Sequence, residues 1–216
     1  MVVSQAPSSM TFAGLEVWFD DRVLRPREWT QAQSDWAAEL LDGAPAGQVL
    51  ELFAGVGHIG LAAVAANARE LVMVDLNPVA CELARRNADA AGMGARVEIR
   101  QGRIDEVLES RETFPVIIAD PPWVPTAGIG EFPEDPTIAI DGGEDGLALA
   151  RIACEVVDRH LAPGGSAILQ LGNIGQADQL DANLAAAGSQ LGVVETRTFE
   201  RGVLVRLGVR AGSSAG

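Results

Sequence analysis

The stretch V-L-E-L-F-A-G-V-G-H-I-G, residues 49–60, predicts how the chain around it is organised. Its apolar start indicates a strand over 48–53, and its end opens a helical pattern over 58–67. Between the two, Gly55, Gly57 and Gly60 form the pattern G-x-G-x-x-G. Because glycine permits a tight turn and a close approach to the backbone, a ligand has room above this turn. The stretch predicts a strand, a turn and a helix with a binding site between them.

The same alternation continues to the end of the chain. Apolar runs indicate strands over 70–75, 96–100, 114–120 and 166–172, and helical patterns lie over 78–92, 146–161 and 176–188. Two further runs, 191–199 and 201–209, indicate a closing antiparallel pair. Strands that alternate with helices predict an α/β fold, a mainly parallel sheet covered on both faces.

The composition indicates one soluble domain. The chain has 216 residues, of which 48% are hydrophobic and 21% charged, and no apolar run approaches the roughly 20 residues of a membrane span. We expect an N-terminal segment over 1–45, a catalytic domain over 46–210, a disordered tail over 211–216 and a cytoplasmic location. Cys81 and Cys154 have no metal-ligand spacing, so two buried reduced thiols and no metal are expected.

The net charge of −14 argues against a nucleic-acid partner. Thirty acidic residues oppose sixteen basic ones, and every basic residue is arginine. Such a surface repels phosphate backbones unless a basic stripe is present, and the sequence contains none. The simple explanation of the negative charge is solubility. The functional explanation is attraction of a cationic substrate.

The strand over 70–75 ends in Asp75, 15 residues beyond Gly60. A carboxylate in this place can accept hydrogen bonds from both hydroxyls of a ribose. Two cofactors therefore remain open. A dinucleotide would place its pyrophosphate on the helix N-terminus. S-adenosylmethionine would lay its methionine part over the glycine turn, with Glu51 facing the sulfonium or ammonium group. His58 is interpreted as a capping or surface residue.

The stretch I-I-A-D-P-P-W-V-P, residues 117–125, ends a strand abruptly. Proline lacks a backbone donor and fixes φ, so two in succession stop the ladder. The strand thereby delivers Asp120 and Trp123 to the edge of the sheet. Asp120 and the carbonyl of Pro121 can each accept an N–H of a flat acceptor group, and Pro122 shapes the turn. Trp123 can stack on that group or on a cation.

Five motifs resemble, in order and spacing, those of class I S-adenosylmethionine-dependent methyltransferases: V-L-E-L-F-A-G-V-G-H-I-G, V-M-V-D-L-N-P, A-R-R-N-A-D-A-A-G, I-I-A-D-P-P-W-V-P and L-A-P-G-G. In that family [D/N/S]-P-P-[Y/F/W] marks enzymes that methylate planar or amide-like nitrogen. The segments 23–41, 140–165 and 171–176 are similar to glutamine methyltransferases of release factors and a ribosomal protein. L-F-A-G itself is closer to small RNA guanine-N2 methyltransferases.

The resemblance implies a Rossmann-like fold with seven strands, the last one antiparallel. It also implies S-adenosyl-L-methionine as cofactor, S-adenosyl-L-homocysteine as product, and a monomer or homodimer. The cofactor-binding positions that follow are Glu51, Phe53, Ala54, Gly55, Gly57, Asp75, Leu76, Arg103, Ile104 and Asp120. The catalytic positions are Asp120, Pro121, Pro122 and Trp123.

Three departures from the family pattern bear on the substrate. Glutamine methyltransferases carry Asn where this chain has Asp120, and a carboxylate only accepts hydrogen bonds, which suits acceptors that present N–H groups alone. About 45 residues precede the strand that leads into the glycine turn, and we expect these to be too few for the entry segment and the upstream helical substrate domain together. Arg103 stands where the family has an acid; Asp105 is the replacement candidate, and Ile104 can pack on adenine or start a helix.

The loop after D-P-P-W is rich in acids, which favours a cationic substrate. We therefore predict an N-methyltransferase for a planar or amine nitrogen of a small amino or guanidino substrate or of a protein side chain. Protein-glutamine methylation is the first alternative. A nicotinamide-dependent oxidoreductase is the second, although it leaves D-P-P-W unexplained. The loop acids are Glu131, Glu134, Asp135, Asp141, Glu144 and Asp145.

Overall fold

The computed structural model describes residues 7–210, so the predicted disorder of 211–216 lies outside the described residues. The strands are β1 (Ser8–Phe12), β2 (Leu15–Phe19), β3 (Val49–Leu52), β4 (Leu71–Asp75), β5 (Val97–Gln101), β6 (Phe114–Ala119), β7 (Leu161–Leu171), β8 (Leu191–Thr198) and β9 (Val203–Val209). The α-helices are α1 (Gln31–Gly43), α2 (His58–Val64), α3 (Pro78–Ala90), α4 (Thr137–Ile140), α5 (Ala148–His160) and α6 (Ile174–Ala186), and short 3-10 turns lie at Glu28–Thr30, Gly94–Arg96 and Thr126–Glu131.

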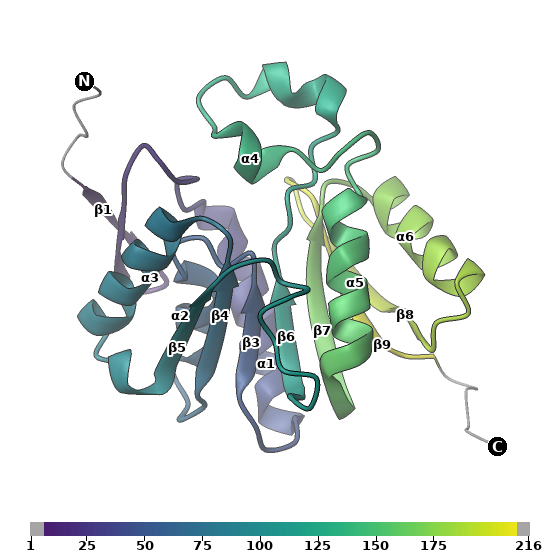
Figure 1. Ribbon diagram of the computed structural model, residues 1–216, viewed down its shortest axis with the longest axis horizontal. Coiled ribbons are helices and arrows are strands. Elements are labelled where there is room, and N and C mark those ends of the chain that lie inside the picture. The colour runs from purple at the N-terminus through teal and green to yellow at the C-terminus, as the bar shows by residue number, and fades with distance from the viewer. Residues whose placement is uncertain (1–6, 211–216) are drawn as a thin grey trace.

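Seven strands form one sheet in the order β5-β4-β3-β6-β7-β9-β8 (Figure 1). The pairs from β5 to β7 are parallel, whereas β9 runs antiparallel to both β7 and β8. The predicted fold class, including its antiparallel last strand, is confirmed. The strand order reverses between β3 and β6, and ligands of such sheets bind beyond the carboxyl ends at this reversal.

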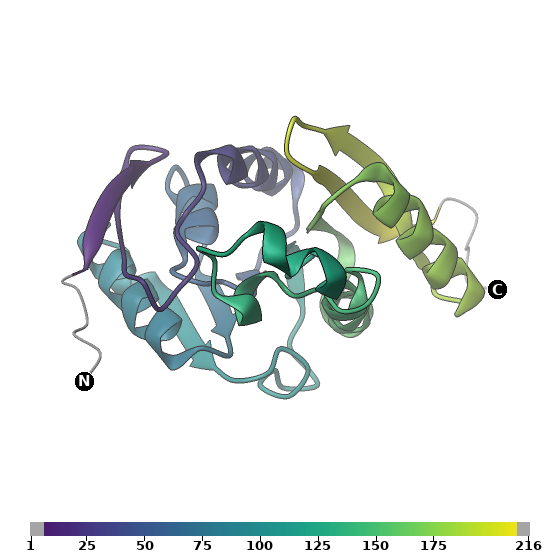
Figure 2. The same ribbon diagram turned by 90° about the horizontal axis from the view of Figure 1, so that it is seen from above.

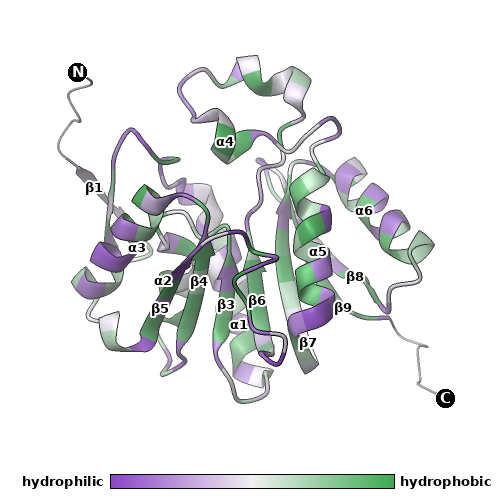
Figure 3. Ribbon diagram, in the orientation of Figure 1, coloured by the Kyte–Doolittle hydropathy of each residue, from purple (hydrophilic) through white to green (hydrophobic). Residues whose placement is uncertain are grey.

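Both faces of the sheet are buried, which explains why its strands are continuously apolar. Along β3, Val49 packs with α1 and α2 and Leu50 packs with α5 and α6, because successive side chains point to opposite faces. Figure 3 shows the resulting hydrophobic strands between helices whose outer sides are hydrophilic. Helices α1, α2 and α3 cover one face, and α5 and α6 cover the other.

Local sequence signals determine where several elements begin. Asn77 caps α3 by accepting a hydrogen bond from the amide of Val79 at 2.9 Å, with Pro78 in the first position. The strand predicted over 166–172 begins earlier than expected, since β7 starts at Leu161, directly after the end of α5. A Cβ at Gly165 would lie 2.7 Å from the carbonyl oxygen of Pro115, so glycine lets this irregular part of β7 stay against β6.

Two segments enclose the carboxyl edge of the sheet. The β1–β2 hairpin lies beside α3, and the chain then crosses to α1 (Figures 1 and 2). The loop 125–141, which contains α4, lies above the carboxyl ends of the strands. No helix within residues 7–210 is long and apolar enough to cross a membrane. Cys81 and Cys154 are buried free thiols, as predicted.

The central strand β6 supplies a test of the packing. Ile117 is fully buried in β6, so Ile117→Ala is expected to lower the free energy of unfolding by about 2–5 kcal/mol through lost contacts and a cavity. Urea denaturation measures this change. The control Val194→Ala removes an exposed side chain of β8 and should stay within about 0.5 kcal/mol of wild type. A loss below about 1 kcal/mol at Ile117 would contradict the assigned core.

Candidate active site

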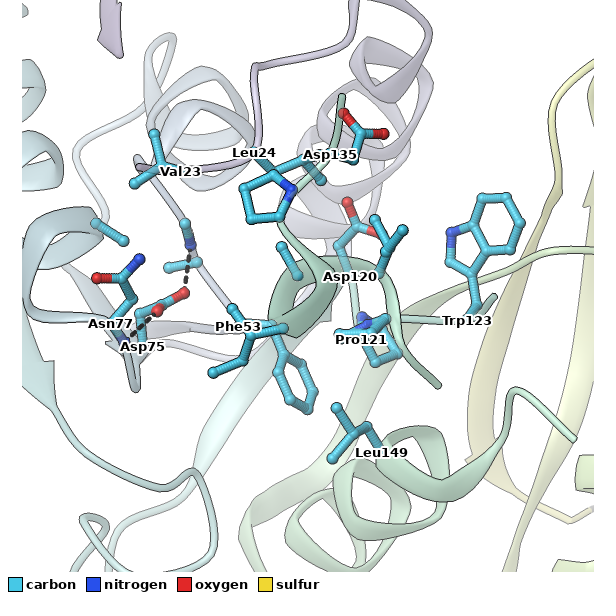
Figure 4. Close-up of a pocket in the computed structure, with 18 of the residues that line it drawn as sticks. Val23, Leu24, Phe53, Asp75, Asn77, Asp120, Pro121, Trp123, Asp135 and Leu149 are labelled. Carbon is cyan, nitrogen blue, oxygen red and sulfur yellow. Dashed lines mark hydrogen bonds between the residues drawn. The ribbon is translucent and has the colours of Figure 1, made fainter. Parts of the chain in front are cut away.

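A cavity of about 790 Å³ opens at the carboxyl ends of β3, β4 and β6, within the size range of small-molecule sites. Its wall includes the segment 22–30, the glycine turn, the end of β4 with the residues that follow it, the segment after β5, the D-P-P-W turn and the loop 131–140. Figure 4 shows the side chains of Asp75 and Asp120 on opposite sides of Phe53. Of the predicted site residues, these line the cavity: Phe53, Ala54, Gly55, Asp75, Leu76, Arg103, Ile104, Asp120, Pro121, Pro122 and Trp123.

The glycine turn brings the backbone close to the cavity and holds strain. Gly57 has φ 77°, a left-handed conformation that favours glycine. A Cβ at this position would also lie only 2.8 Å from the sulfur of Met73. Gly57 itself does not line the cavity, unlike Gly55. Phe53 has φ 56°, a left-handed conformation that costs a non-glycine residue about 1–3 kcal/mol. Strain of this kind is concentrated at functional sites.

Asp75 ends β4 and lies between two backbone amides. One carboxylate oxygen accepts from the amide of Gly55 at 2.7 Å and the other accepts from the amide of Asn77 at 2.8 Å. Burial raises the pKa of Asp75 above its ordinary value. Each oxygen has a second lone pair, so the oriented carboxylate can also accept from two hydroxyls of a ligand. Leu76, next in the chain, lines the cavity with 55% of its surface exposed.

Glu51 lies behind the glycine turn. It is 2% exposed, its Oε1 accepts from the amide of Gly60 at 3.0 Å, and its Oε2 has no partner among the described residues. Burial, with smaller contributions from the charges of Asp120 and Asp75, raises the pKa of Glu51 to about 8. Glu51 is not among the residues that line the cavity, so its predicted contact with a cofactor stays a prediction.

Asp120 follows the last residue of β6 and lies in the cavity wall. Burial raises the pKa of Asp120 to about 7, and among the described residues no donor meets its carboxylate. Pro121 and Pro122 are buried, and Trp123 is half-buried. The turn thus presents a carboxyl group to the cavity, with Pro121 and Trp123 on the same wall (Figure 4).

The segment after β5 brings Arg103, Ile104 and Asp105 to the cavity wall. Arg103 is half-exposed and pairs with Asp105 at 2.9 Å and with Glu106 at 3.0 Å. One oxygen of the Asp105 carboxylate is therefore engaged by an arginine, whereas its buried Oδ1 has no partner among the described residues. Ile104 is 6% exposed, belongs to the apolar core and also lines the cavity, and it lies in a turn rather than at the start of a helix.

The acidic cluster is smaller than the sequence indicates. Of the six loop acids, only Glu131, Glu134 and Asp135 line the cavity. Asp135 forms an ion pair with Arg27, whose position 108 residues earlier gives no local sequence signal. The remaining three acids, Asp141, Glu144 and Asp145, lie outside the cavity wall. Asp141 accepts a hydrogen bond from the hydroxyl of Thr126, and Asp145 forms an ion pair with Arg151.

The segment 22–30 adds residues that the sequence did not single out. Arg27 ties this segment to the loop above the cavity through Asp135. The hydroxyl of Thr30 donates to the carbonyl of Arg27 at 2.7 Å, so Nε2 of His58 donates to that hydroxyl at 3.2 Å. Burial lowers the pKa of His58 to about 3, which keeps its imidazole neutral. The interpretation of His58 as a capping or surface residue was wrong, because its ring packs inward against Phe12.

The chain has relatives of named activity. Residues 30–132 match the protein family described as Conserved hypothetical protein 95. The release factor glutamine methyltransferase of Geobacter sulfurreducens is 37% identical over 77% of this chain and 59% of its own length. The ribosomal protein uL3 glutamine methyltransferase of Bordetella pertussis is 30% identical over 71% of this chain and 54% of its own length. The chain thus spans between half and two thirds of these relatives.

A solved structure shares the architecture. The RNA methyltransferase of Salinibacter ruber, in complex with S-adenosyl-L-homocysteine, matches with a TM-score of 0.56 at 18% identity over 85% of this chain and 92% of its own. The fold is that of a class I methyltransferase. The predicted resemblance to that class, and within it to glutamine methyltransferases, is confirmed.

Within residues 7–210, no group of three His, Cys, Asp or Glu side chains could hold a metal ion.

The raised pKa of Asp120 predicts how stability depends on pH. Because the folded pKa of about 7 exceeds the unfolded value of 3.8, the folded state binds the extra proton, and this stabilisation is lost as pH rises towards 7. Between about pH 5 and about pH 8, wild type should lose about 2–3 kcal/mol relative to Asp120→Asn, which has no such proton. Denaturant unfolding at both pH values measures this, and a constant difference would contradict the shift.

Proposed function

We propose that the protein is an S-adenosylmethionine-dependent N-methyltransferase. The fold, the names of its relatives and the S-adenosyl-L-homocysteine bound by the Salinibacter ruber enzyme support this function. One observation carries it further: Asp75 and Asp120 face the same cavity, the first already oriented by two amides and the second without a hydrogen-bond partner among the described residues. The proposed cofactor site and the proposed acceptor site thus lie in the same cavity.

The residues present fit the proposed cofactor. The free lone pairs of Asp75 suit ribose hydroxyls, and the apolar side chains of Leu76 and Ile104 offer a surface for a flat base. The backbone at Gly55 suits the methionine part, because no side chain intervenes there. When bound, S-adenosyl-L-methionine supplies a methyl group on a positively charged sulfur. The cation would also offset the negative charge of Asp75 and Asp120.

The D-P-P-W turn would orient the acceptor. A planar nitrogen is a poor nucleophile because its lone pair is delocalised, so its orientation contributes much of the rate. Asp120 and the carbonyl of Pro121 can each accept one N–H bond and thereby direct the nitrogen towards the methyl group. The ring of Trp123 lies on the same wall and can contact a flat or cationic group.

The ionisation of Asp120 divides two classes of acceptor. An ionised carboxylate only accepts, which suits a guanidinium or amine. A protonated carboxyl has one O–H donor and one carbonyl acceptor, the same pair that an Asn amide offers to a glutamine side chain. With a pKa of about 7, both forms are accessible near neutral pH. The names of the relatives favour the glutamine class, and the carboxylate itself favours the guanidinium class.

The two aspartates should separate cofactor binding from transfer. Asp75→Ala removes the ribose acceptor and is expected to weaken binding of S-adenosyl-L-methionine about 10- to 100-fold, measured by calorimetry. Asp120→Ala should leave this affinity within about threefold while abolishing transfer. Equal loss of binding in both variants would mean that Asp120 supports the fold rather than the acceptor. Unchanged affinity in Asp75→Ala would remove Asp75 from the cofactor site.

Methyl transfer from isotope-labelled S-adenosyl-L-methionine, followed by mass spectrometry, tests the function and the acceptor. The acceptors are free arginine, an arginine peptide, a Gly-Gly-Gln peptide and an RNA pool. Glutamine methylation should fall as pH rises through the pKa of Asp120, because the neutral carboxyl is needed. Guanidinium methylation should rise, because the carboxylate is needed. Label on RNA would contradict the two proposed acceptor classes, and label on none of the acceptors would contradict the proposed function.

Asp120→Asn serves as the matched control for this experiment. An Asn amide offers one donor and one acceptor at every pH, so glutamine methylation should persist and lose its pH dependence. Guanidinium methylation should fall, because an amide donor then faces an N–H group. The opposite pattern in this variant would overturn the hydrogen-bond account of acceptor choice.

A further inference from the structure

The D-P-P-W turn has few means of holding itself in place. Pro121 and Pro122 have no backbone N–H, so the turn cannot continue the ladder of β6 or close through their amides. Within residues 7–210, the next backbone-to-backbone hydrogen bond after the two prolines is at Val124, whose amide donates to the carbonyl of Ile140 at 3.0 Å. Transfer to a planar nitrogen nevertheless requires that Asp120 be held within fractions of an ångström. The contacts that position it must come from outside the turn.

A buried glutamine holds the first end of the turn. Gln33 lies in α1 and is fully buried. Its Nε2 donates to the carbonyl of Ala119 at 2.9 Å, the residue directly before Asp120. This hydrogen bond joins α1 to β6 across 86 residues of sequence.

A second buried glutamine holds the other end. Gln176 lies in the first turn of α6 and is 7% exposed. Its Nε2 donates to the carbonyl of Trp123 at 3.0 Å and to the carbonyl of Asp145 at 3.2 Å, and its Oε1 accepts from the amide of Gly172 at 2.8 Å. One amide group thereby joins the D-P-P-W turn, the loop before α5 and the end of β7.

Three glycines let other backbone segments approach the same turn. A Cβ at Gly142 would lie 2.8 Å from the carbonyl oxygen of Pro122. A Cβ at Gly146 would lie 2.3 Å from that of Trp123, and one at Gly172 would lie 2.5 Å from the indole ring. Any side chain at these positions would displace the turn. The segments D-G-G-E-D-G and L-G-N-I-G-Q therefore form the surface on which D-P-P-W rests.

We propose that Gln33 and Gln176 are positioning residues that fix the acceptor clamp from its two ends. Glutamine suits both places because its amide donates to a carbonyl, and Gln176 also uses its oxygen as an acceptor. Methionine has a similar length and is apolar, so Gln→Met removes the hydrogen bonds and keeps the packing. Neither glutamine touches the acceptor; each acts through the turn.

Fluorine NMR of protein labelled with 5-fluorotryptophan tests the positioning without any substrate. The chain has four tryptophans, whose resonances are assigned by single Trp→Phe variants. In Gln176→Met the resonance of Trp123 should shift or broaden, while the other three keep their wild-type positions. The control Gln179→Met makes the same substitution at an exposed site one turn further along α6 and should change none of the four.

A second variant guards against a folding defect. Gln176→Glu keeps the length of the side chain and can donate only when its carboxyl is protonated. Its Trp123 resonance should therefore lie closer to the wild-type position at low pH, where the carboxyl is protonated and can donate one hydrogen bond, than at high pH. A wild-type Trp123 resonance in Gln176→Met at every pH would overturn the proposal. So would the simultaneous loss of all four resonances in both variants, since Gln176 would then support the whole fold.

The effect on catalysis rests on the proposed function. With an acceptor that wild type methylates, Gln33→Met and Gln176→Met should lower kcat about 10- to 100-fold and leave the affinity for S-adenosyl-L-methionine within about threefold. Gln31→Met, at the exposed start of α1, is the control for Gln33. Unchanged kcat in both variants would overturn the positioning role. If wild type methylates no acceptor, the proposed function fails, while the fluorine spectra still decide the role of Gln176.

Discussion

Three carboxyl groups stand at the ends of three adjacent parallel strands, and the chemistry of the site depends on them. Glu51, Asp75 and Asp120 belong to β3, β4 and the end of β6, and burial raises the pKa of each. The pKa of Glu51 also responds to the charges of the other two. Carboxylates that share a poorly solvated space resist full ionisation unless a cation joins them. A ligand with a positive sulfur supplies such a cation, and its binding is thereby coupled to proton release.

The rest of the site is organised around the place where β6 stops. Two prolines end the strand, and the loop that follows rises over the cavity before it returns to α5. The ion pair between Arg27 and Asp135 joins this loop to the segment before α1. The amides of Gln33 and Gln176 join the turn itself to α1 and α6. Motifs that lie far apart in the sequence are thus parts of one packed unit, which explains why they occur together.

Periodicity and turn chemistry predicted the sheet, its helices and the position of Asp75, because these follow from local sequence. The same signals could not predict which charged side chains pair with each other. The sequence gives no indication that Asp135 forms an ion pair, because its partner Arg27 lies 108 residues earlier in the chain. His58 at the start of a helix gave no sign that α1 and the β1–β2 hairpin would cover it. Gln176 ends the motif L-G-N-I-G-Q, yet its contacts to the carbonyls of Trp123 and Asp145 come from segments distant in the sequence.

A single proton on Asp120 separates two chemistries that its sequence position alone cannot distinguish. The protonated form presents the donor and acceptor of an amide, and the ionised form presents only acceptors. In the free protein, burial favours the protonated form up to about pH 7. A cationic cofactor in the same cavity favours the ionised form, because opposite charges lower the pKa of a carboxyl. The charge of an ionised Asp120 in turn helps to raise the pKa of Glu51, which favours the protonated form of Glu51. In the proposed function, the protonation state of Asp120 when the cofactor is bound would therefore decide which acceptor class is favoured.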